Sequence, residues 1–383
     1  MRKTSSVVCS VVAVCLCFMQ SCTAREIRPL PQTNRAYEQL RKLLLSAIKD
    51  AAPLKRNGAK FQEPIPGGTP FPCNTGPGSP GARSPIRPTT VHKLRPGDID
   101  VVGAMGDSIT AGNGAASLNM MQAYVENRGL SFAIGGESTW RKYLTLPNIL
   151  KEFNPKLVGY SLGDSLGFMN DSKFNVAEPI AMNRDLVFQS KLLIRRMKAD
   201  QNVDFYKDWK IVTVLMGHND FCSDMCYRDW TILPEKTRTE LEIALSYLQE
   251  NMPRALINLV PPLDVTNIKS ITNAAPECQM FFRVACSCFF GPRGEYGQEV
   301  FKKIIKMSQQ IYFEIVNNDR YANKEDFAVV VQPFSLNAKF HYTTKGDKNV
   351  TDLSDLAADC LHLSQKGHAL GTRKLKKLPR LYS

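Results

Sequence analysis

Residues 99–109 read Ile-Asp-Val-Val-Gly-Ala-Met-Gly-Asp-Ser-Ile. The apolar run at 99–105 predicts a buried strand of a parallel sheet. The glycine that follows marks a turn, so Ser108 would stand just beyond the carboxyl end of that strand. Ligands of parallel α/β sheets bind beyond the carboxyl ends of the strands. Ser108 is therefore a candidate nucleophile.

Short apolar runs and helical patterns alternate along the rest of the chain. Besides 100–105, the predicted strands are residues 130–134, 211–216, 255–260 and 327–331. Apolar residues at helical spacing mark residues 186–197, 241–248 and 300–315. The alternation predicts a three-layer α/β/α fold, in which helices cover both faces of a parallel central sheet.

Three further blocks carry the residues that a nucleophilic serine needs. They are Gly135-Gly136, Gly217-His218-Asn219-Asp220 and Asp359-Cys360-Leu361-His362. A serine hydroxyl is a poor nucleophile until a nearby base takes its proton. His362 stands three residues after Asp359, so the carboxylate can orient the imidazole from one face of a helical turn or contact the histidine through its backbone. His368 is a weaker candidate, interpreted as a surface or helix residue.

Attack on an ester carbonyl places negative charge on its oxygen, so hydrogen-bond donors must already point there. The backbone N–H of Ser108, a glycine N–H from Gly135-Gly136 and the side-chain amide of Asn219 would form such an oxyanion hole. All the blocks follow predicted strands, which places them at one edge of the sheet.

The tripeptide Gly-Asp-Ser occurs a second time, at Gly163-Asp164-Ser165, after the strand-like run 157–162. It is interpreted as a loop, because it lacks the small-residue sequence that follows Ser108. The order of the blocks also fits only the first copy.

The four blocks, in this order, resemble the SGNH (GDSL-type) esterase and lipase superfamily. Residues 88–96, 146–154 and 325–334 are similar to the membrane-associated phospholipase B family, and the similarity runs from about residue 88 to 369. The resemblance implies a flavodoxin-like SGNH-hydrolase fold and a cofactor-free enzyme. It also implies a catalytic set of Ser108, Asp359 and His362 with an oxyanion hole of Ser108, Gly136 and Asn219, Gly135 being the alternative to Gly136. The closing helix of that family is expected to be lost, shortened or replaced after Leu370.

The net charge of +13 on 383 residues is spread through the chain, apart from the basic stretch 373–377. Such a balance could attract nucleic acid or an anionic lipid surface. Because no nucleic-acid recognition motif accompanies it, a solvated basic surface is the preferred interpretation, with no nucleic-acid partner.

The N-terminus has the layout of a secretory signal: basic residues at 2–3, an apolar run at 7–18 and small residues at 22–24. That run is too short to span a bilayer, and no spanning segment or anchor-type tail is seen. The expected organisation is a signal peptide at 1–24, a helix and Pro/Gly-rich strap at 25–97, the hydrolase domain at 98–370 and a basic tail at 371–383. Secretion to the extracellular space is expected.

Seven of the eleven cysteines lie beyond the predicted signal, at positions 73, 222, 226, 278, 286, 288 and 360. In an oxidising compartment they are expected to form disulfides with one thiol left over. The pairs at 222/226 and 286/288 superficially suggest a metal site, but no histidine pair stands at ligand spacing, so no metal is expected. Spacing leaves the pairing open.

The predicted function is a secreted serine esterase that hydrolyses acyl esters of phospholipids and lysophospholipids and meets membranes or micelles peripherally. The alternatives are a short-chain or carbohydrate acetyl esterase, and an inactive lipid-binding protein. Residues 120–130 and 278–290 are rich in Met and aromatic side chains. They either wall an acyl-chain trough beside Ser108, or complete the core or pin disulfide-bonded loops. Asn170 and Asn349 begin sequons and are candidate glycan acceptors.

Overall fold

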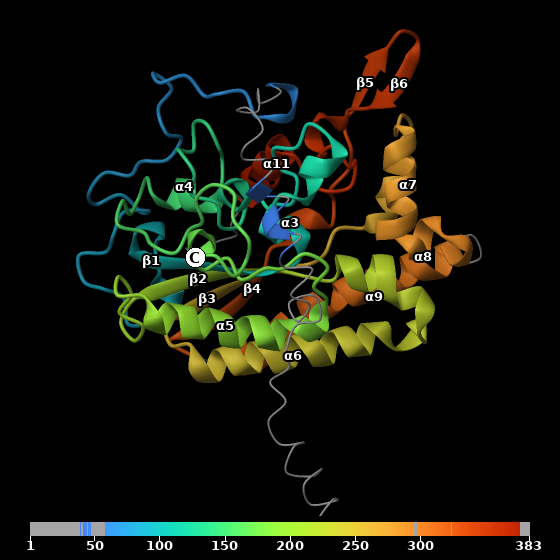
Figure 1. The fold of residues 1–383 in the computed structure, drawn as a ribbon. Helices are drawn as coiled ribbons and strands as arrows, with labels where there is room; N and C mark the ends of the chain where they lie inside the picture. The colour runs from blue at the N-terminus through green and yellow to red at the C-terminus, as the bar shows by residue number, and fades with distance from the viewer. Residues whose placement is uncertain are drawn as a thin grey trace, which may run out of the picture. The chain divides into compact units, whose positions relative to one another are not determined.

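The computed structural model describes residues 39, 41–43, 45–46, 58–294, 297–322 and 324–375. The chain divides into two compact units, Met1–Leu43 and Leu44–Ser383. The elements below belong to the second unit (Figure 1). The predicted signal peptide and residues 376–383 of the predicted tail lie outside the described residues.

Four parallel strands form the central sheet in the order β1-β2-β3-β4. They are β1 (Ile99–Gly106), β2 (Trp209–Leu215), β3 (Ala255–Val260) and β4 (Phe327–Val331). Gly106 pairs with Leu215 of β2, which pairs in turn with Val260 of β3, so the carboxyl ends of these strands meet at one edge. Four of the five predicted strands are confirmed.

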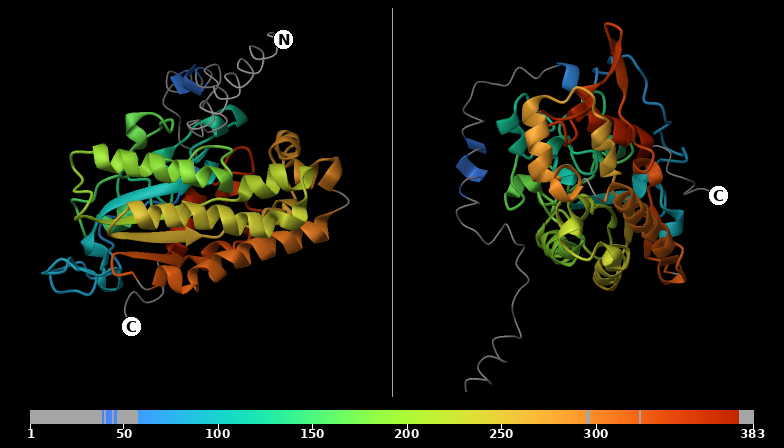
Figure 2. Two further views of the ribbon diagram at one scale, coloured as in Figure 1. Left: turned by 90° about the horizontal axis from the view of Figure 1, so that it is seen from below. Right: turned by 90° about the vertical axis from the view of Figure 1, so that its right-hand side faces the viewer.

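Helices cover both faces of the sheet, which confirms the predicted three-layer fold (Figures 1 and 2). One face packs on α5 (Leu186–Ala199), α6 (Leu233–Asn251) and α9 (Gln298–Val316), whose apolar residues recur at helical spacing and are buried against the strands. The opposite layer contains α4 (Leu146–Leu150) and α11 (Gln365–Leu375). The remaining elements are α3 (Ser108–Ala111), α7 (Pro276–Ala285), α8 (Ser287–Phe290), α10 (Asp319–Ala322), β5 (Tyr342–Lys345) and β6 (Lys348–Thr351), the last two forming an antiparallel hairpin.

The predicted strand at 130–134 is wrong. A 3-10 turn, Arg128–Leu130, opens this stretch, and the N–H of Gly135 turns back to the carbonyl of Ser131 at 2.8 Å. Only an isolated bridge joins Gly135 to Ser161. The apolar side chains that suggested a strand are nevertheless buried, since Phe132 and Ile134 pack on the face of the sheet that α4 covers.

Residues 58–97 are irregular and pack on the domain without a core of their own. Val91 and Leu94 pack into the core on the face of the sheet that α4 covers. The indole N–H of Trp209 donates to the carbonyl of Pro88 at 2.9 Å. At the other end, α11 continues through Leu375, so the closing helix is not lost at Leu370 and the expected boundary there falls inside a helix. The other domain boundaries stay predictions.

Three disulfides stabilise the region around α7 and α8, and they join Cys222 to Cys286, Cys226 to Cys288 and Cys278 to Cys360. Of the seven cysteines in the described residues, Cys73 is free and exposed, which confirms the predicted disulfides with one thiol left over. Phe282 and Phe289 are buried among these sulfurs. The third disulfide ties α7 to the loop that holds Asp359 and His362.

Candidate active site

Ser108 stands at the sharp turn where β1 ends and α3 begins. The buried Asp107 caps α3, because its Oδ1 accepts the N–H of Ile109 at 3.0 Å. Gly106 makes the turn possible, since a Cβ there would lie 2.4 Å from the carbonyl oxygen of Leu215. The hydroxyl of Ser108 is thereby held at the carboxyl edge of the sheet.

Ser108, His362 and Asp359 form a continuous hydrogen-bonded chain. The Nε2 atom of His362 lies 2.8 Å from the Oγ of Ser108, and its Nδ1 lies 2.6 Å from Oδ2 of Asp359. The other carboxylate oxygen of Asp359 accepts the backbone N–H groups of Leu361 and His362 at 3.0 and 2.9 Å. Asp359 therefore holds the imidazole with its proton on Nδ1, which leaves Nε2 free to accept the serine proton.

The surroundings of His362 stabilise its protonated form. Burial alone would lower the pKa of His362, but the charge and hydrogen bond of Asp359, together with the charge of Asp107, raise it above its usual value of 6.5. Burial would raise the pKa of Asp359, but the neighbouring imidazole and the N–H donors of Leu361 and His362 hold it below its usual value. The pair is thus arranged to stabilise an imidazolium that forms when the serine loses its proton.

A second histidine contact, between His218 and Asp107, was not foreseen from the sequence. Nδ1 of His218 lies 2.7 Å from Oδ2 of Asp107, and its Nε2 accepts the N–H of Leu263 at 2.9 Å. These two bonds require the neutral tautomer with its proton on Nδ1. His218 therefore orients Asp107, the residue that caps α3, and does not contact Ser108 as a base. In the sequence, only the position of His218 between Gly217 and Asn219 indicated that it lies near the site.

The two glycines do not supply the expected oxyanion donor. The N–H of Gly136 donates to the carbonyl of Ser161 at 2.9 Å, and that of Gly135 donates to Ser131. The prediction for Gly136, and for Gly135 as its alternative, is therefore wrong, because both N–H groups are already bonded within the protein. A Cβ on Gly136 would lie 2.0 Å from the ring of Tyr160, so this glycine serves close packing.

A tight turn at residues 178–181 lies beside the site instead. The N–H of Glu178 donates to the carbonyl of Gly106 at 3.1 Å, and the side-chain amide of Asn219 donates to the carbonyl of Ala181 at 2.9 Å. These two hydrogen bonds attach the turn to the end of β1 on one side of Ile180 and to Asn219 on the other. Ile180 has φ +66°, as the third position of a type II turn requires, although β-branched residues rarely adopt it. Its N–H has no acceptor among the described residues.

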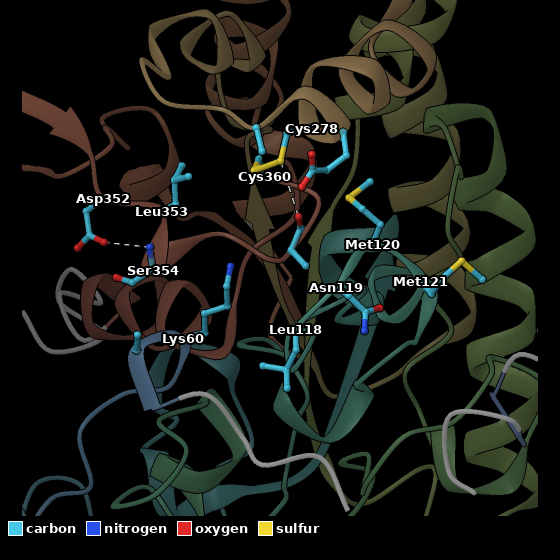
Figure 3. Close-up of a pocket in the computed structure, with 14 residues that line it drawn as sticks. Lys60, Leu118, Asn119, Met120, Met121, Cys278, Asp352, Leu353, Ser354 and Cys360 are labelled. Atoms are coloured by element: carbon cyan, nitrogen blue, oxygen red, sulfur yellow. Dashed lines mark hydrogen bonds between the residues drawn. A yellow bond between two sulfur atoms is a disulfide. The ribbon is translucent and has the colours of Figure 1, made fainter. Parts of the chain in front are cut away.

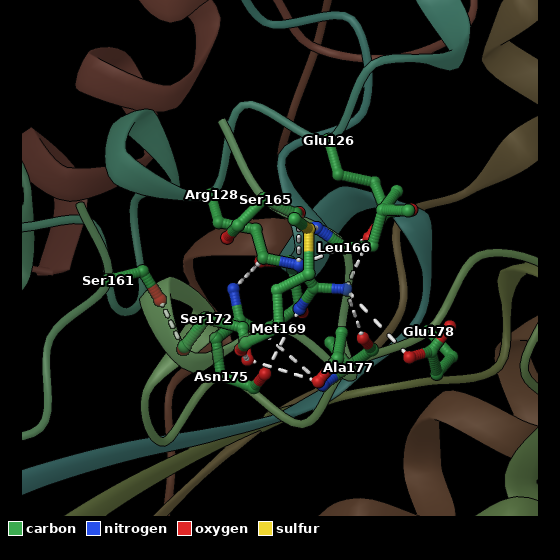
Figure 4. Close-up of polar contacts among 12 residues, drawn as sticks. Glu126, Arg128, Ser161, Ser165, Leu166, Met169, Ser172, Asn175, Ala177 and Glu178 are labelled. Atoms are coloured by element: carbon green, nitrogen blue, oxygen red, sulfur yellow. Dashed lines mark hydrogen bonds and ion pairs between the residues drawn. The ribbon is translucent and has the colours of Figure 1, made fainter. Parts of the chain in front are cut away.

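The second Gly-Asp-Ser sequence belongs to a structural network around the buried Arg128 (Figure 4). The guanidinium of Arg128 forms an ion pair with Glu126 and donates to the carbonyls of Ser165, Asn175 and Ala177 at 2.8–3.0 Å. Within the described part of the chain, the buried hydroxyl of Ser165 has no hydrogen-bond partner. Ser165 is thus not paired with a histidine, and the network holds the loop that leads to Ile180.

The Met- and Phe-rich insert residues divide between the core and the mouth of the site. Phe282 and Phe289 are buried, whereas Met121, Tyr124 and Met280 are more than half exposed. The ring of Phe281 has its centroid 6.4 Å from that of His362 and 6.4 Å from that of Tyr124. An apolar rim therefore extends from the histidine along α7 and the 3-10 helix Met120–Tyr124.

The other candidate residues do not belong to the hydrogen-bonded chain of Ser108, His362 and Asp359. His368 is helical as expected but buried rather than at the surface, and its Nδ1 accepts the N–H of Phe132; burial and the charge of His362 lower its pKa to about 3. Asn170 and Asn349 are both exposed, although Ser172 of the first sequon is buried. No cluster of His, Cys, Asp and Glu among the described residues could hold a metal ion.

Residues 102–374 match the family described as GDSL-like Lipase/Acylhydrolase. The matched segment includes Ser108, Asp359 and His362. The chain belongs to the GDSL-like lipase/acylhydrolase family. The family assignment confirms the predicted resemblance and supports the predicted class of carboxylic ester hydrolase.

Curated relatives refine the family. The chain is 38% identical over 299 residues to the membrane-associated phospholipase B1 of Mus musculus, covering 77% of this chain and 20% of that protein. It is 35% identical over 361 residues to the phospholipase B1 of Homo sapiens, covering 91% and 24%. The chain thus spans about a fifth to a quarter of the length of these relatives. Among solved structures, an extracellular lipase from Streptomyces rimosus aligns with a TM-score of 0.36 at 13% identity, over 73% of this chain and 100% of that one.

Proposed function

We propose that this protein is a secreted serine esterase that hydrolyses acyl esters of phospholipids and lysophospholipids through an acyl-enzyme. The observation that carries the proposal is the hydrogen-bonded chain of Ser108, His362 and Asp359 at the carboxyl edge of the sheet. Identity of 35–38% to phospholipase B1 supports a phospholipid substrate. Within the part of the chain that the structure describes, every helix is too short or too polar to span a bilayer.

In the first half of the reaction, Oγ of Ser108 attacks the ester carbonyl while Nε2 of His362 takes its proton. The tetrahedral intermediate then collapses, the bond to the leaving alcohol breaks, and His362 gives the proton to that alcohol. In the second half, a water molecule gives its proton to His362 and attacks the acyl-enzyme. The carboxylic acid leaves, and the proton returns to Ser108. Asp359 keeps the imidazole oriented throughout.

Three donors are available for the oxyanion. They are the backbone N–H of Ser108, the second N–H of the Asn219 amide and the backbone N–H of Ile180, which takes the role first assigned to Gly136. The first N–H of Asn219 is held by Ala181, which fixes the direction of the amide. Donors that are fixed before the reaction stabilise the developing charge without reorganisation.

Removing the Asn219 amide is expected to slow the chemistry selectively. Asn219→Ala should lower kcat by about a hundred- to a thousandfold, the usual cost of one oxyanion donor. Steady-state kinetics on a soluble ester measures the change, with a thermal melt to verify folding. A fall confined to KM, with kcat retained, would remove Asn219 from the oxyanion hole.

The pH profile should report the raised pKa of His362. Since the base must be neutral, kcat/KM is expected to rise with pH through a midpoint above 6.5, the usual pKa of histidine. Asp359→Asn removes the charge that raises this pKa, so the midpoint should move to lower pH while the maximum rate falls. An unchanged midpoint in Asp359→Asn would contradict the coupling of these two residues.

A substrate panel tests the proposed function itself. Purified protein is expected to deacylate both lysophospholipid and diacyl phospholipid, with rates on long chains at least matching those on acetyl esters. The apolar rim formed by Met121, Tyr124 and Phe281 is the expected contact of the acyl chain. Rapid cleavage of acetyl esters with phospholipid micelles left intact would instead favour a small-ester hydrolase.

Secretion is tested by expression in a secreting cell. The mature chain is expected to begin at or near Arg25 and to carry a glycan at Asn349, which lies on the exposed hairpin β5–β6. Asn170 is the weaker acceptor because the Ser172 hydroxyl is buried and hydrogen-bonded to the carbonyl of Met169. N-terminal sequencing and glycosidase treatment measure both outcomes, and an uncleaved cytosolic product would contradict them.

A further inference from the structure

A hollow of about 880 Å³ lies against the loop that carries Asp359 (Figure 3). Ala358 and Cys360, the residues on either side of Asp359, form part of its wall. Its apolar lining comes from Leu118, Met120, Met121 and Ala275, and its charged lining from Lys60, Glu277 and Asp352. The hollow is thus amphipathic and adjoins the catalytic loop.

The ammonium group of Lys60 points into this hollow (Figure 3). Lys60 is half-buried and donates one hydrogen bond, to the carbonyl of Leu356 at 2.7 Å. No carboxylate within 4 Å pairs with it among the described residues, and its other two N–H groups have no acceptor there. Burial lowers the pKa of Lys60, and the charge of Asp359 partly offsets this effect. A desolvated cation of this kind gains most from an anionic ligand.

The two carboxylates that line the hollow are accessible to solvent. Glu277 is exposed in the first turn of α7, and Asp352 is half-exposed with Lys366 at 3.5 Å. A half-buried cation and more exposed carboxylates in one hollow match a ligand that carries both a phosphate and a positively charged amine.

The hollow is connected to the histidine through two elements. Met120 and Met121 belong to the 3-10 helix that ends in Tyr124, and Glu277 and Cys278 belong to the α7 turn before Phe281. Tyr124 and Phe281 contact each other, and Phe281 lies beside His362. The acyl chain of an ester at Ser108 would contact Tyr124 and Phe281, and the polar end of the ester would enter the hollow past Ala358 and Cys360, which flank Asp359.

We propose that this hollow is the headgroup subsite, in which Lys60 binds the phosphate of a phospholipid and Glu277 with Asp352 faces the cationic amine. The inference rests on the proposed function. It assigns recognition of the headgroup to Lys60, Glu277 and Asp352, which lie outside the hydrogen-bonded chain of Ser108, His362 and Asp359.

The test compares two esters of one acyl chain that differ only in the headgroup: lysophosphatidylcholine and monoacylglycerol, both below their micelle concentrations. Lys60→Met should lower the ratio of their kcat/KM values about ten- to a hundredfold, because one charge-assisted hydrogen bond is lost. Lys60→Arg should restore most of the ratio. Lys306→Met removes the same charge from an exposed site on α9 and should leave the ratio unchanged.

Equal losses on both esters in Lys60→Met would overturn the proposal, since they would mean that Lys60 only supports the Leu356 carbonyl. A second readout does not depend on phospholipid hydrolysis. Glycerophosphocholine should inhibit monoacylglycerol hydrolysis by the unmodified protein and should do so at least tenfold more weakly in Lys60→Met. Equal inhibition by inorganic phosphate would instead indicate a free-phosphate site. Inhibition that depends on Lys60, without phospholipid turnover, would refute the proposed function but retain the subsite.

Discussion

Ser108→Ala is expected to abolish ester hydrolysis while the protein remains folded. The loss should approach a millionfold in kcat, the scale seen when the nucleophile of a serine triad is removed. The oxyanion donors and substrate binding would leave about a thousand- to ten-thousandfold acceleration over water. Stopped-time assays on a chromogenic ester at high enzyme concentration measure the residual rate.

The matched control for this variant is Ser165→Ala, the same substitution in the second Gly-Asp-Ser sequence. Ser165 is buried next to Arg128, and its hydroxyl makes no hydrogen bond in the described structure, so this variant should keep its activity. The reverse result, an active Ser108→Ala and an inactive Ser165→Ala, would assign the nucleophile to the other copy.

Arg128→Met is expected to reduce the free energy of unfolding by about 3–5 kcal/mol, as is usual when one partner of a buried ion pair is removed. Arg128 is fully buried, and its loss removes the ion-pair partner of the buried Glu126. Three carbonyl groups of the loop at 165–177 also lose their donor. Chemical denaturation followed by tryptophan fluorescence measures the change.

An exposed ion pair provides the comparison for Arg128. Arg238 pairs with Glu314 at the surface, where the two side chains are 27% and 44% exposed, so Arg238→Met should cost less than about 1 kcal/mol. The double variant Arg128→Met/Glu126→Leu should recover part of the lost stability because it also removes the buried carboxylate that has lost its Arg128 partner. A loss below 1 kcal/mol in Arg128→Met would contradict the structural role assigned to this network.

The sequence predicted the parts of the fold that follow from local patterns. The strands β1 to β4 are continuous apolar runs, and α5, α6 and α9 repeat apolar residues at helical spacing, so both patterns reflect burial directly. The run at 130–134 failed for the same reason: burial of Phe132 and Ile134 gives an apolar run, but the backbone forms turns. An apolar run reports what is buried and does not report the hydrogen-bond partners.

The residues of the site also differ in how well the sequence predicted them. Ser108, Asp359 and His362 lie in short blocks whose internal spacing carries the chemistry, and the structure brings them into hydrogen-bond contact. The turn at Ile180 had no such signal, because an isoleucine gives no indication of a left-handed backbone conformation. Gly136 was misleading, because the sequence does not distinguish a glycine required for close packing from a glycine whose N–H donates to the oxyanion. The pairing of the cysteines depends on the tertiary fold and could not be read from their spacing.

The most direct test of the acyl-enzyme mechanism is to trap the nucleophile. Purified protein is treated with a fluorophosphonate, and the modified peptide is identified by mass spectrometry. A single adduct on Ser108 is expected, with none in His362→Ala because the serine is no longer activated. An adduct on Ser165, or ester hydrolysis by a protein that takes up no label, would contradict the account.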